Sequence, residues 1–429
     1  MFSRDLVTRN IVSPYGLAMI SYTFFLFACI IPPSIYSHYM MEPDLMFLDP
    51  ATILFYTLCV GAFAAGVYLV GWVYPSCYVD RKFETRIPPT LFLLAPLILA
   101  VTAAALTGFY LIEHYPIIML SLLAQQGQDV KDTVAFEVSG HLALIPLVLI
   151  GVTWWAFGNY SYLGFQGWRK RLVTFSLVVA VISVVAFSTL TLNRSLLMLA
   201  VCGLAILYVI PRTAHKQIGL GFVFRSGVTI AVCIFLLFLG FSFLRGTASW
   251  DDQVYAFLGY TVASYNRLAA VVNGDLHYPF AGRGIYLSGF VAHSHILPFS
   301  SLMNSPDPLD VWTSEFDAVS RAGLDSRLIW SGAFGYIFSD LGWFSVPFVF
   351  GYGMLYGVVW NWMKQGKVLG IVLYPCFGFC TLFWIGSNYL LDQPLEVLSV
   401  VAIVLSIYEF LLVKRPGKSM RLVNALNRP

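Results

Sequence analysis

The sequence predicts an all-α, polytopic membrane protein with about ten transmembrane helices and one large loop on the outer side. Hydrophobic residues make up 59% of the chain and charged residues only 11%, whereas soluble domains are about 25% charged. Apolar stretches of roughly 20 residues, the length that crosses a bilayer as a helix, recur along the chain. Lys and Arg are concentrated in alternate connecting segments, as the positive-inside rule requires.

The apolar stretches divide the chain into three parts. Residues 1–244 hold spans one to seven with short loops, residues 245–341 form the large outer loop, and residues 342–429 hold the remaining spans and a tail. The N-terminal apolar run is long and lacks a small-residue cleavage site, so we interpret it as a retained span and not as a signal peptide. The predicted spans are about 15–36, 51–75, 89–111, 141–160, 172–191, 195–211, 226–244, 342–362, 369–388 and 394–413.

The connecting segments orient these spans. With the N-terminus inside, every short inner loop is basic, and the outer side keeps only Lys131, Arg194 and the arginines of the large loop. Both ends of the chain are therefore predicted to be cytoplasmic. The inner basic residues lie within 4–9, 81–86, 169–171, 212–225, 364–367 and 414–428.

Three outer segments are more than simple turns. Residues 112–140 are expected to form an interfacial helix followed by a polar loop, and residues 191–195 form a very short hairpin between two spans. In the large loop, residues 252–273 carry apolar side chains at helical spacing, which predicts an amphipathic helix. Residues 294–308 are rich in Ser and Pro, which indicates irregular structure. No internal repeat is visible, so an inverted-repeat transporter architecture gains no support.

The large loop carries several arginines but no lysine between Arg245 and Trp330. Cations are scarce on the outer side of a membrane, and guanidinium groups bind phosphates and carboxylates in bidentate fashion. Two or three such arginines could hold a diphosphate and stabilise it as a leaving group, and local pairing with acids of the loop is the alternative. At a span end, Arg194 is either an anion clamp or an arginine that reaches the lipid headgroups. The candidates are Arg194, Arg245, Arg267, Arg283, Arg321 and Arg327.

Three side chains are candidates for a general base that takes a proton from a sugar hydroxyl. His293 and His295 lie in the large loop, and a neutral His suits this role. The alternative for both is a plain surface position, and a zinc site would lack a third ligand at a usual spacing. Asp340 lies at the entrance of a span, where it is either a helix N-cap or a site residue.

Two acidic pairs raise the question of a divalent cation. Glu42-Pro43-Asp44 and Glu315-Phe316-Asp317 could bind such an ion together with a glycosyl donor, although loops whose cations are kept inside are acidic without any metal. Cys376 and Cys380 share a helix face but have no His or acidic partner nearby, so no metal site is predicted there.

The layout and several short motifs resemble a known family. Asn193-Arg194-Ser195 closes the short hairpin, the large loop comes late in the chain, and Gly335-Tyr336 is followed by Asp340-Leu341-Gly342. In these features the chain resembles the Wzy-type polysaccharide polymerases of bacterial inner membranes, which build O-antigen or exopolysaccharide and are related to the O-antigen ligases. Arg321 and Gly332 fit the Arg-x10-Gly spacing of that family, and Arg194 matches the arginine of its short hairpin.

The resemblance implies a GT-C-like membrane glycosyltransferase that joins undecaprenyl-diphosphate-linked oligosaccharides at the periplasmic face without metal or other cofactor. Its partners would be the donor and acceptor lipids, the membrane, a chain-length regulator and a flippase, and not a nucleic acid. In this hypothesis the base is one of Asp340, His293 and His295, and Arg194 and Arg321 act in catalysis. The expected substrate-binding residues are Arg245, Arg267, Arg283, Arg327, Tyr265 and Asn266.

Two other kinds of function are compatible with this architecture. An O-antigen ligase would differ in its acceptor, and a metal-dependent transferase that takes a polyprenyl-phosphate sugar would use Glu42 and Asp44. A transporter of lipid-linked oligosaccharides predicts ionisable groups near the bilayer midplane. Glu409, near the inner end of the last span, is the nearest case.

Overall fold

The computed structural model describes residues 11–76, 84–124, 144–160, 163, 165–215, 240, 249–287, 306, 308–386 and 393–414. Within these ranges the protein is helical apart from two-residue strands, β1 (Glu84–Thr85) and β2 (Val413–Lys414). The predicted all-α class is thus confirmed for this part of the chain. Three candidate site residues, Arg245, His293 and His295, lie outside it, as does the predicted span 226–244 apart from Gly240.

Several helices are long and apolar enough to cross a membrane, which supports a membrane-embedded protein. In the described ranges there are 5 of them, or up to 6 if the pair α1 (Pro14–Cys29) and α2 (Pro33–Met40), bent by 91°, counts as one span. Three further apolar helices are shorter, and a helix of about 16 residues reaches only about 24 Å of the roughly 30 Å hydrocarbon core. The long ones are α3 (Pro50–Val73), α4 (Pro89–His114), α8 (Gly167–Leu190), Gly332–Lys364 and α19 (Gln393–Leu412). The shorter ones are α7 (Ile145–Tyr160), α18 (Val368–Leu382) and the apolar part Arg194–Ile210 of α9 (Arg194–His215).

The segment Gly332–Lys364 begins ten residues before the predicted span 342–362. It consists of α16 (Gly332–Leu341), the short 3₁₀ turn η3 (Gly342–Phe344) and α17 (Ser345–Lys364). Gly342 has a φ of 55°, a value that side-chain-bearing residues rarely adopt. Gly342 therefore interrupts the regular helical backbone between α16 and α17.

Proline marks where the N-terminal helices begin. Pro14, Pro33, Pro50, Pro89 and Pro116 each open a helix, the position where the missing N–H costs nothing and the fixed φ suits the helix. The last of these helices is α5 (Pro116–Leu123), which directly follows α4 and matches the predicted interfacial helix.

Helices α3 and α17 pack with their backbones in contact. A Cβ added at Gly66 would lie 2.1 Å from the carbonyl oxygen of Phe350, and one at Gly353 would lie 2.2 Å from that of Phe63. Close approach through small residues is the usual way in which membrane helices gain packing energy, since lipid offers no hydrophobic drive. The tight pair α3–α17 thereby supports the outer elements above it.

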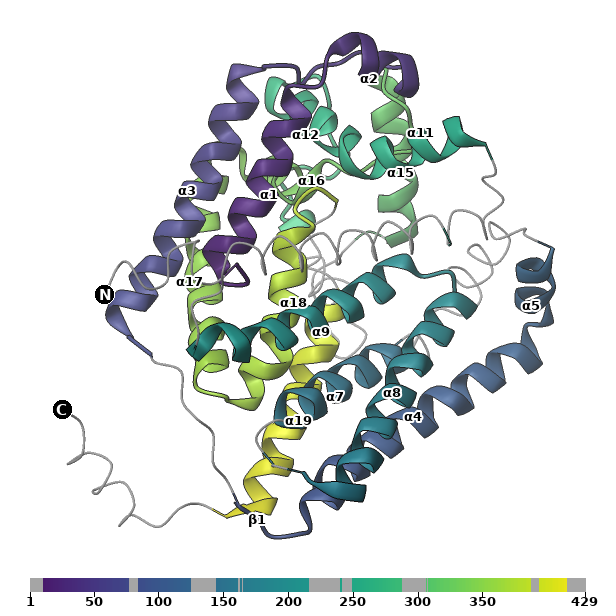
Figure 1. The fold of residues 1–429 in the computed structure, drawn as a ribbon. Coiled ribbons are helices and arrows are strands. Elements are labelled where there is room, and N and C mark those ends of the chain that lie inside the picture. The colour runs from purple at the N-terminus through teal and green to yellow at the C-terminus, as the bar shows by residue number, and fades with distance from the viewer. Residues whose placement is uncertain are drawn as a thin grey trace.

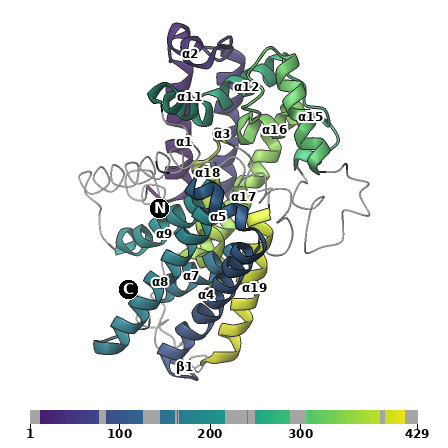
Figure 2. The same ribbon diagram turned by 90° about the vertical axis from the view of Figure 1, so that its right-hand side faces the viewer.

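Two ends of the molecule are clearly distinguished in Figures 1 and 2. At one end, β1 pairs with β2 in antiparallel fashion and joins the segment before α4 to the end of α19. At the other end lie α2, α11 (Trp250–Thr261), α12 (Ala263–Asn273) and α15 (Pro308–Arg321). Two of the segments that the charge pattern places inside, around residues 84–86 and 414, meet in the β1–β2 pair, so we identify the opposite end with the predicted outer side.

The predicted amphipathic helix at 252–273 is two helices, and its second half is not interfacial. The chain breaks at Val262, between α11 and α12, and α12 is buried from Ala263 to Val271. The polar side of the helical pattern faces buried polar partners and not water. This is why an amphipathic sequence is found here inside the protein.

Candidate functional site

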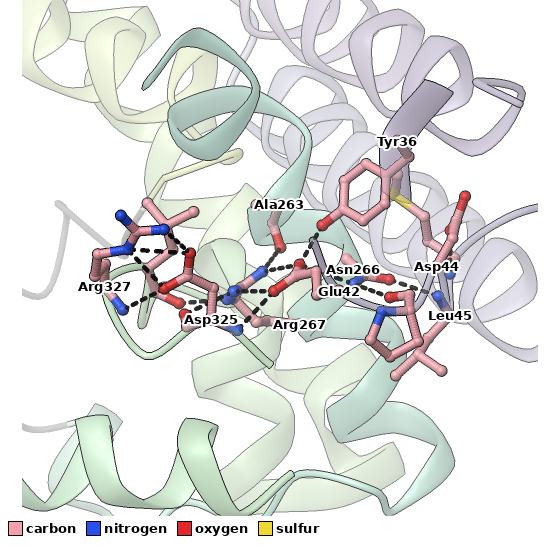
Figure 3. A network of polar contacts seen from close by, with 12 residues as sticks. Tyr36, Glu42, Asp44, Leu45, Ala263, Asn266, Arg267, Asp325 and Arg327 are labelled. Carbon is pink, nitrogen blue, oxygen red and sulfur yellow. Dashed lines mark hydrogen bonds and ion pairs between the residues drawn. The ribbon is translucent and has the colours of Figure 1, made fainter. Parts of the chain in front are cut away.

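A buried ion pair joins the loop between α2 and α3 to the large loop that was predicted at 245–341 (Figure 3). Nη1 of Arg267 on α12 and Oε1 of Glu42 lie 2.8 Å apart, and Nη2 donates to Oε2 at the same distance. The side chains are 0% and 1% exposed. Burial alone lowers the pKa of Arg267, but its hydrogen bond and charge interaction with Glu42 outweigh this and raise the pKa above its ordinary value. Arg267 therefore keeps its positive charge.

Arg267 uses all of its hydrogen-bond donors within the protein. Besides Glu42, its guanidinium donates to the carbonyl oxygens of Ala263 at 3.0 Å and Asp325 at 2.9 Å, and its Nε donates to that of Leu328. A guanidinium has five N–H donors, so none is left for a bound diphosphate. Arg267 was predicted to bind substrate, and in this structure it ties α12 to the segment 325–328 instead.

Glu42 is the hub of this network. It also accepts a hydrogen bond from Asn266 Nδ2 at 3.1 Å, from the backbone N–H of Asp325 at 2.7 Å and from the hydroxyl of Tyr36 on α2. Asn266 completes the link to the first loop, since its Oδ1 accepts from Leu45 N at 2.7 Å. Glu42 and Asn266 thus connect three segments that lie far apart in the sequence.

The acidic pair of the first loop, Glu42 and Asp44, accepts hydrogen bonds from groups of the protein itself. Both carboxylate oxygens of Glu42 accept from Arg267, and Oδ1 of Asp44 accepts from the backbone N–H groups of Met46 and Phe47. This geometry gives the pair a structural role in the described part of the chain. The sequence offered no sign of it, because the partner arginine is 225 positions away.

Arg327 presents an oriented cation at the surface beside this network (Figure 3). Its side chain is 70% exposed, and its Nη2 lies 2.7 Å from Oδ2 of Asp325. The guanidinium carbon lies 4.5 Å from the ring centre of Tyr255 on α11, in a cation–π contact. Burial alone would raise the pKa of Asp325, but hydrogen bonds from Arg327 and Tyr255 lower it to about 2. The ring and the carboxylate fix the plane of the guanidinium and leave much of it open to solvent.

Arg283 and Asp340 are brought together by a turn of the large loop. Asp340, in the last turn of α16, accepts hydrogen bonds from the backbone N–H groups of Gly284 and Leu287, each at 3.1 Å. Asp340 is therefore not the N-cap of its own helix, which begins at Gly332. It anchors the turn that carries the exposed Arg283, whose guanidinium lies 5.6 Å from the ring centre of Phe280.

The remaining predicted residues lie in different settings. Arg321 is exposed at the end of α15, where its Nε donates to the carbonyl of Asp317 at 3.2 Å. Arg194 is half-buried at the first position of α9, just after Asn193, whose Oδ1 accepts from Leu196 N at 3.0 Å. Tyr265 is buried against Phe25 and Tyr56, with ring centres 5.2 and 5.9 Å away, so it is part of the core.

The predicted hairpin at 191–195 is present and packs on α5. Leu192 and Leu197 form a small buried cluster with Ile118, and Leu192 has a φ of 48°. Arg194 therefore lies next to a hairpin whose leucines pack on α5.

Glu315, named in the sequence analysis as part of an acidic pair, proves to be buried, which the sequence pattern did not predict. Glu315 on α15 is 6% exposed, and burial raises its pKa to about 8, an effect that the neighbouring hydroxyls of Tyr286 and Tyr336 offset only in part. The rings of Tyr278, Tyr286 and Tyr336 stack around one another with centres 5.3 to 5.6 Å apart. At neutral pH this carboxyl holds a proton, a property that its place in the acidic pair Glu315-Phe316-Asp317 did not suggest.

The structure thus brings Asn266, Arg267 and Arg327 into one network and sets Asp340 against the turn that follows Arg283, while Arg194 and Arg321 lie on α9 and at the end of α15. Among the residues that the structure describes, no three His, Cys, Asp or Glu side chains gather as metal ligands would. Comparison with protein-family models, with curated proteins and with solved structures finds no match for this chain.

Proposed function

We propose that the protein is a membrane glycosyltransferase that polymerises undecaprenyl-diphosphate-linked oligosaccharide units at the periplasmic face of a bacterial inner membrane. In this proposal the chain crosses the membrane about ten times, and both termini are cytoplasmic. The observation that carries the proposal is the oriented, exposed guanidinium of Arg327 on a segment fixed by the buried Glu42–Arg267 pair. A rigid anion-binding group at the outer end of a membrane-embedded fold suits a lipid-linked diphosphate.

In the proposed reaction, the bond from the anomeric carbon of the donor to the diphosphate oxygen is replaced by a bond to an acceptor oxygen. A hydroxyl of the acceptor attacks that carbon, the bond to the diphosphate oxygen breaks, and undecaprenyl diphosphate leaves with the electron pair. Arg327, with Arg194, Arg245 and Arg321, would stabilise the charge that grows on the leaving group. A base chosen from Asp340, His293 and His295 would take the hydroxyl proton.

Arg267 and Asn266 take a different role in this proposal from the one the sequence suggested. They act as positioning residues, because their donors hold the first loop and the segment 325–328 together. Arg283 remains a candidate contact for sugar or phosphate, since it is exposed on a turn that Asp340 anchors. The proposed reaction is expected to need no cofactor.

The proposal is tested with purified protein and one lipid-diphosphate-linked oligosaccharide, with products separated on a gel. Arg327→Ala is expected to reduce the rate of polymer formation at least tenfold, since it removes a charge-assisted contact worth about 1.5–3 kcal/mol. Arg327→Lys keeps the charge but loses the planar group that Asp325 and Tyr255 orient, and is expected to recover only part of the rate.

Arg171→Ala is the matched control, because Arg171 is an exposed arginine near the start of α8, at the opposite end of the molecule. It should polymerise at the wild-type rate. Equal rates for Arg327→Ala and Arg171→Ala, at equal amounts of folded protein, would remove the central support of the proposal.

A further inference from the structure

A pocket lies at the inner end of the molecule, between the first turns of α4 and α8. It has a volume of about 400 Å³ and is lined by Pro89 and Thr90 of α4 and by Gln166, Trp168 and Arg169 around the start of α8, with Leu163 and Phe165 from the preceding loop. One wall is therefore apolar and aromatic, and the other offers hydrogen-bond donors. The first turn of α4 directly follows β1 in the chain and lies, with β1, at the end of the molecule opposite α2, α11 and α12 (Figure 2).

The polar wall is suited to an anion. Thr90, Gln166 and Arg169 can each donate hydrogen bonds, and the residues that the structure places around the pocket include no carboxylate. Both α4 and α8 begin at this pocket, and neither has a side-chain cap in the described structure. The open N–H groups and positive ends of both helices thus add to the charge of Arg169.

The pocket also lies at the depth of lipid headgroups. Helices α4 and α8 have 26 and 24 residues, and at 1.5 Å per residue each is longer than the roughly 30 Å hydrocarbon core. Their first turns therefore reach the interface. Trp168 is 68% exposed and its ring centre lies 5.8 Å from the guanidinium carbon of Arg169. Tryptophan is enriched at this depth, where its ring contacts chains and headgroups at once.

We infer that this pocket binds the phosphate of an anionic phospholipid of the inner leaflet, with the apolar wall against the upper part of the acyl chains. Basic pockets between membrane helices on the cytoplasmic side bind such headgroups in other proteins. The inference is independent of the proposed glycosyl transfer, since it concerns the opposite end of the molecule.

The test is native mass spectrometry of the purified full-length protein in detergent, titrated with phosphatidylglycerol or with phosphatidylcholine. Arg169→Ala is expected to weaken the tightest phosphatidylglycerol binding about tenfold, since a hydrogen bond to a charged group is lost. Phosphatidylcholine binding should not change. Thr90→Val, from the other helix, is a second variant and should weaken the same site by a smaller factor.

Lys170→Ala is the matched control, because Lys170 is an exposed cation next to Arg169 that does not line the pocket. A loss confined to Arg169→Ala and Thr90→Val supports a defined site. Equal losses for Lys170→Ala and Arg169→Ala would show only diffuse attraction to a basic surface and overturn the inference. Full displacement of phosphatidylglycerol by excess inorganic phosphate would also overturn it, since the site would then take soluble phosphate and not a lipid.

Discussion

At the scale of the residue, burial separates arginines that look equivalent in the sequence. Arg267 and Arg327 both lie in the large loop, yet the first is enclosed with Glu42 and the second is 70% exposed. A buried guanidinium with all donors satisfied positions the chain, whereas an exposed and oriented one can meet a ligand. The sequence could not distinguish them, because the burial of Arg267 depends on the first loop, more than two hundred residues before it.

Removing Glu42 should be strongly destabilising. Glu42→Ala leaves the buried charge of Arg267 without a partner, a loss of about 3–5 kcal/mol for pairs of this kind. The melting temperature of the purified protein in detergent should fall by several degrees, and the double variant Glu42→Gln, Arg267→Met should recover part of the loss. Asp44→Asn, two residues away, is the control and should have a smaller effect. A double variant less stable than Glu42→Ala would show that the unpaired charge of Arg267 is not the cause of the loss of stability.

Glu315 should make stability fall as the pH rises. Its pKa is about 8 in the folded protein and 4.5 ordinarily, so between these values the folded state holds a proton that the unfolded state has lost. The contribution of the protonated Glu315 to the free energy of unfolding is complete below about pH 4.5. It declines by about 1.4 kcal/mol per pH unit between about pH 4.5 and about pH 8. Glu315→Gln imitates the protonated form, so its melting temperature should change less between about pH 5 and about pH 8 than that of the wild type.

The control for this comparison is Asp317→Asn, an exposed acid on the same helix. It should keep the wild-type dependence on pH. Identical pH profiles for the wild type and Glu315→Gln would mean that the carboxyl is ionised at neutral pH and that the burial argument fails.

At the scale of the element, apolar length and proline position predict helices well, but amphipathic spacing alone does not say what a polar face will contact. The starts of α3 and α4, at Pro50 and Pro89, fall within a residue of the predicted spans. Residues 252–273 show the opposite case: the pattern is interrupted at Val262, and its second half, α12, is buried with Asn266 and Arg267 bound to Glu42. The short helix α7 ends at Tyr160 as predicted but begins four residues later, at Ile145, and α18 ends at Leu382, before the predicted end at 388.

The α3–α17 contact should not tolerate a larger residue. Gly353→Ala would place a Cβ 2.2 Å from the carbonyl oxygen of Phe63, and overpacking of this kind typically costs 1–3 kcal/mol or more when backbone must move. Gly351→Ala is the matched control on the same helix, because a Cβ there would meet nothing within 4 Å. The two variants are compared by their melting temperatures and by their yields of monodisperse protein. A neutral Gly353→Ala would show that the two helices do not approach as closely as described.

At the scale of the whole molecule, charge distribution and structure agree on which segments share a side. The β1–β2 pair joins segments around residues 84 and 414, which the positive-inside rule independently places together. The outer network could not be predicted, since Glu42, Asn266, Arg267 and Asp325 come from three separate segments and meet only through the fold. The resemblance to Wzy-type polymerases stays a hypothesis about function.

Sidedness can be tested by labelling with a membrane-impermeant thiol reagent. The described cysteines are buried, so with Cys77 and Cys233 replaced by Ser the background should be low. In right-side-out vesicles Ser326→Cys is expected to react, and Lys170→Cys only after the membrane is opened. The reverse pattern would put the arginine network on the inner side and contradict the orientation proposed here.

The most direct measurement of the central claim uses purified wild-type protein in liposomes with one lipid-diphosphate-linked oligosaccharide, with and without chelator. We predict a ladder of longer lipid-linked glycans that persists in chelator, because the arginines stabilise the leaving diphosphate. Movement of the lipid-linked unit across the bilayer with no ladder would contradict the account and indicate a transporter. A ladder abolished by chelator would contradict the role given to the arginines.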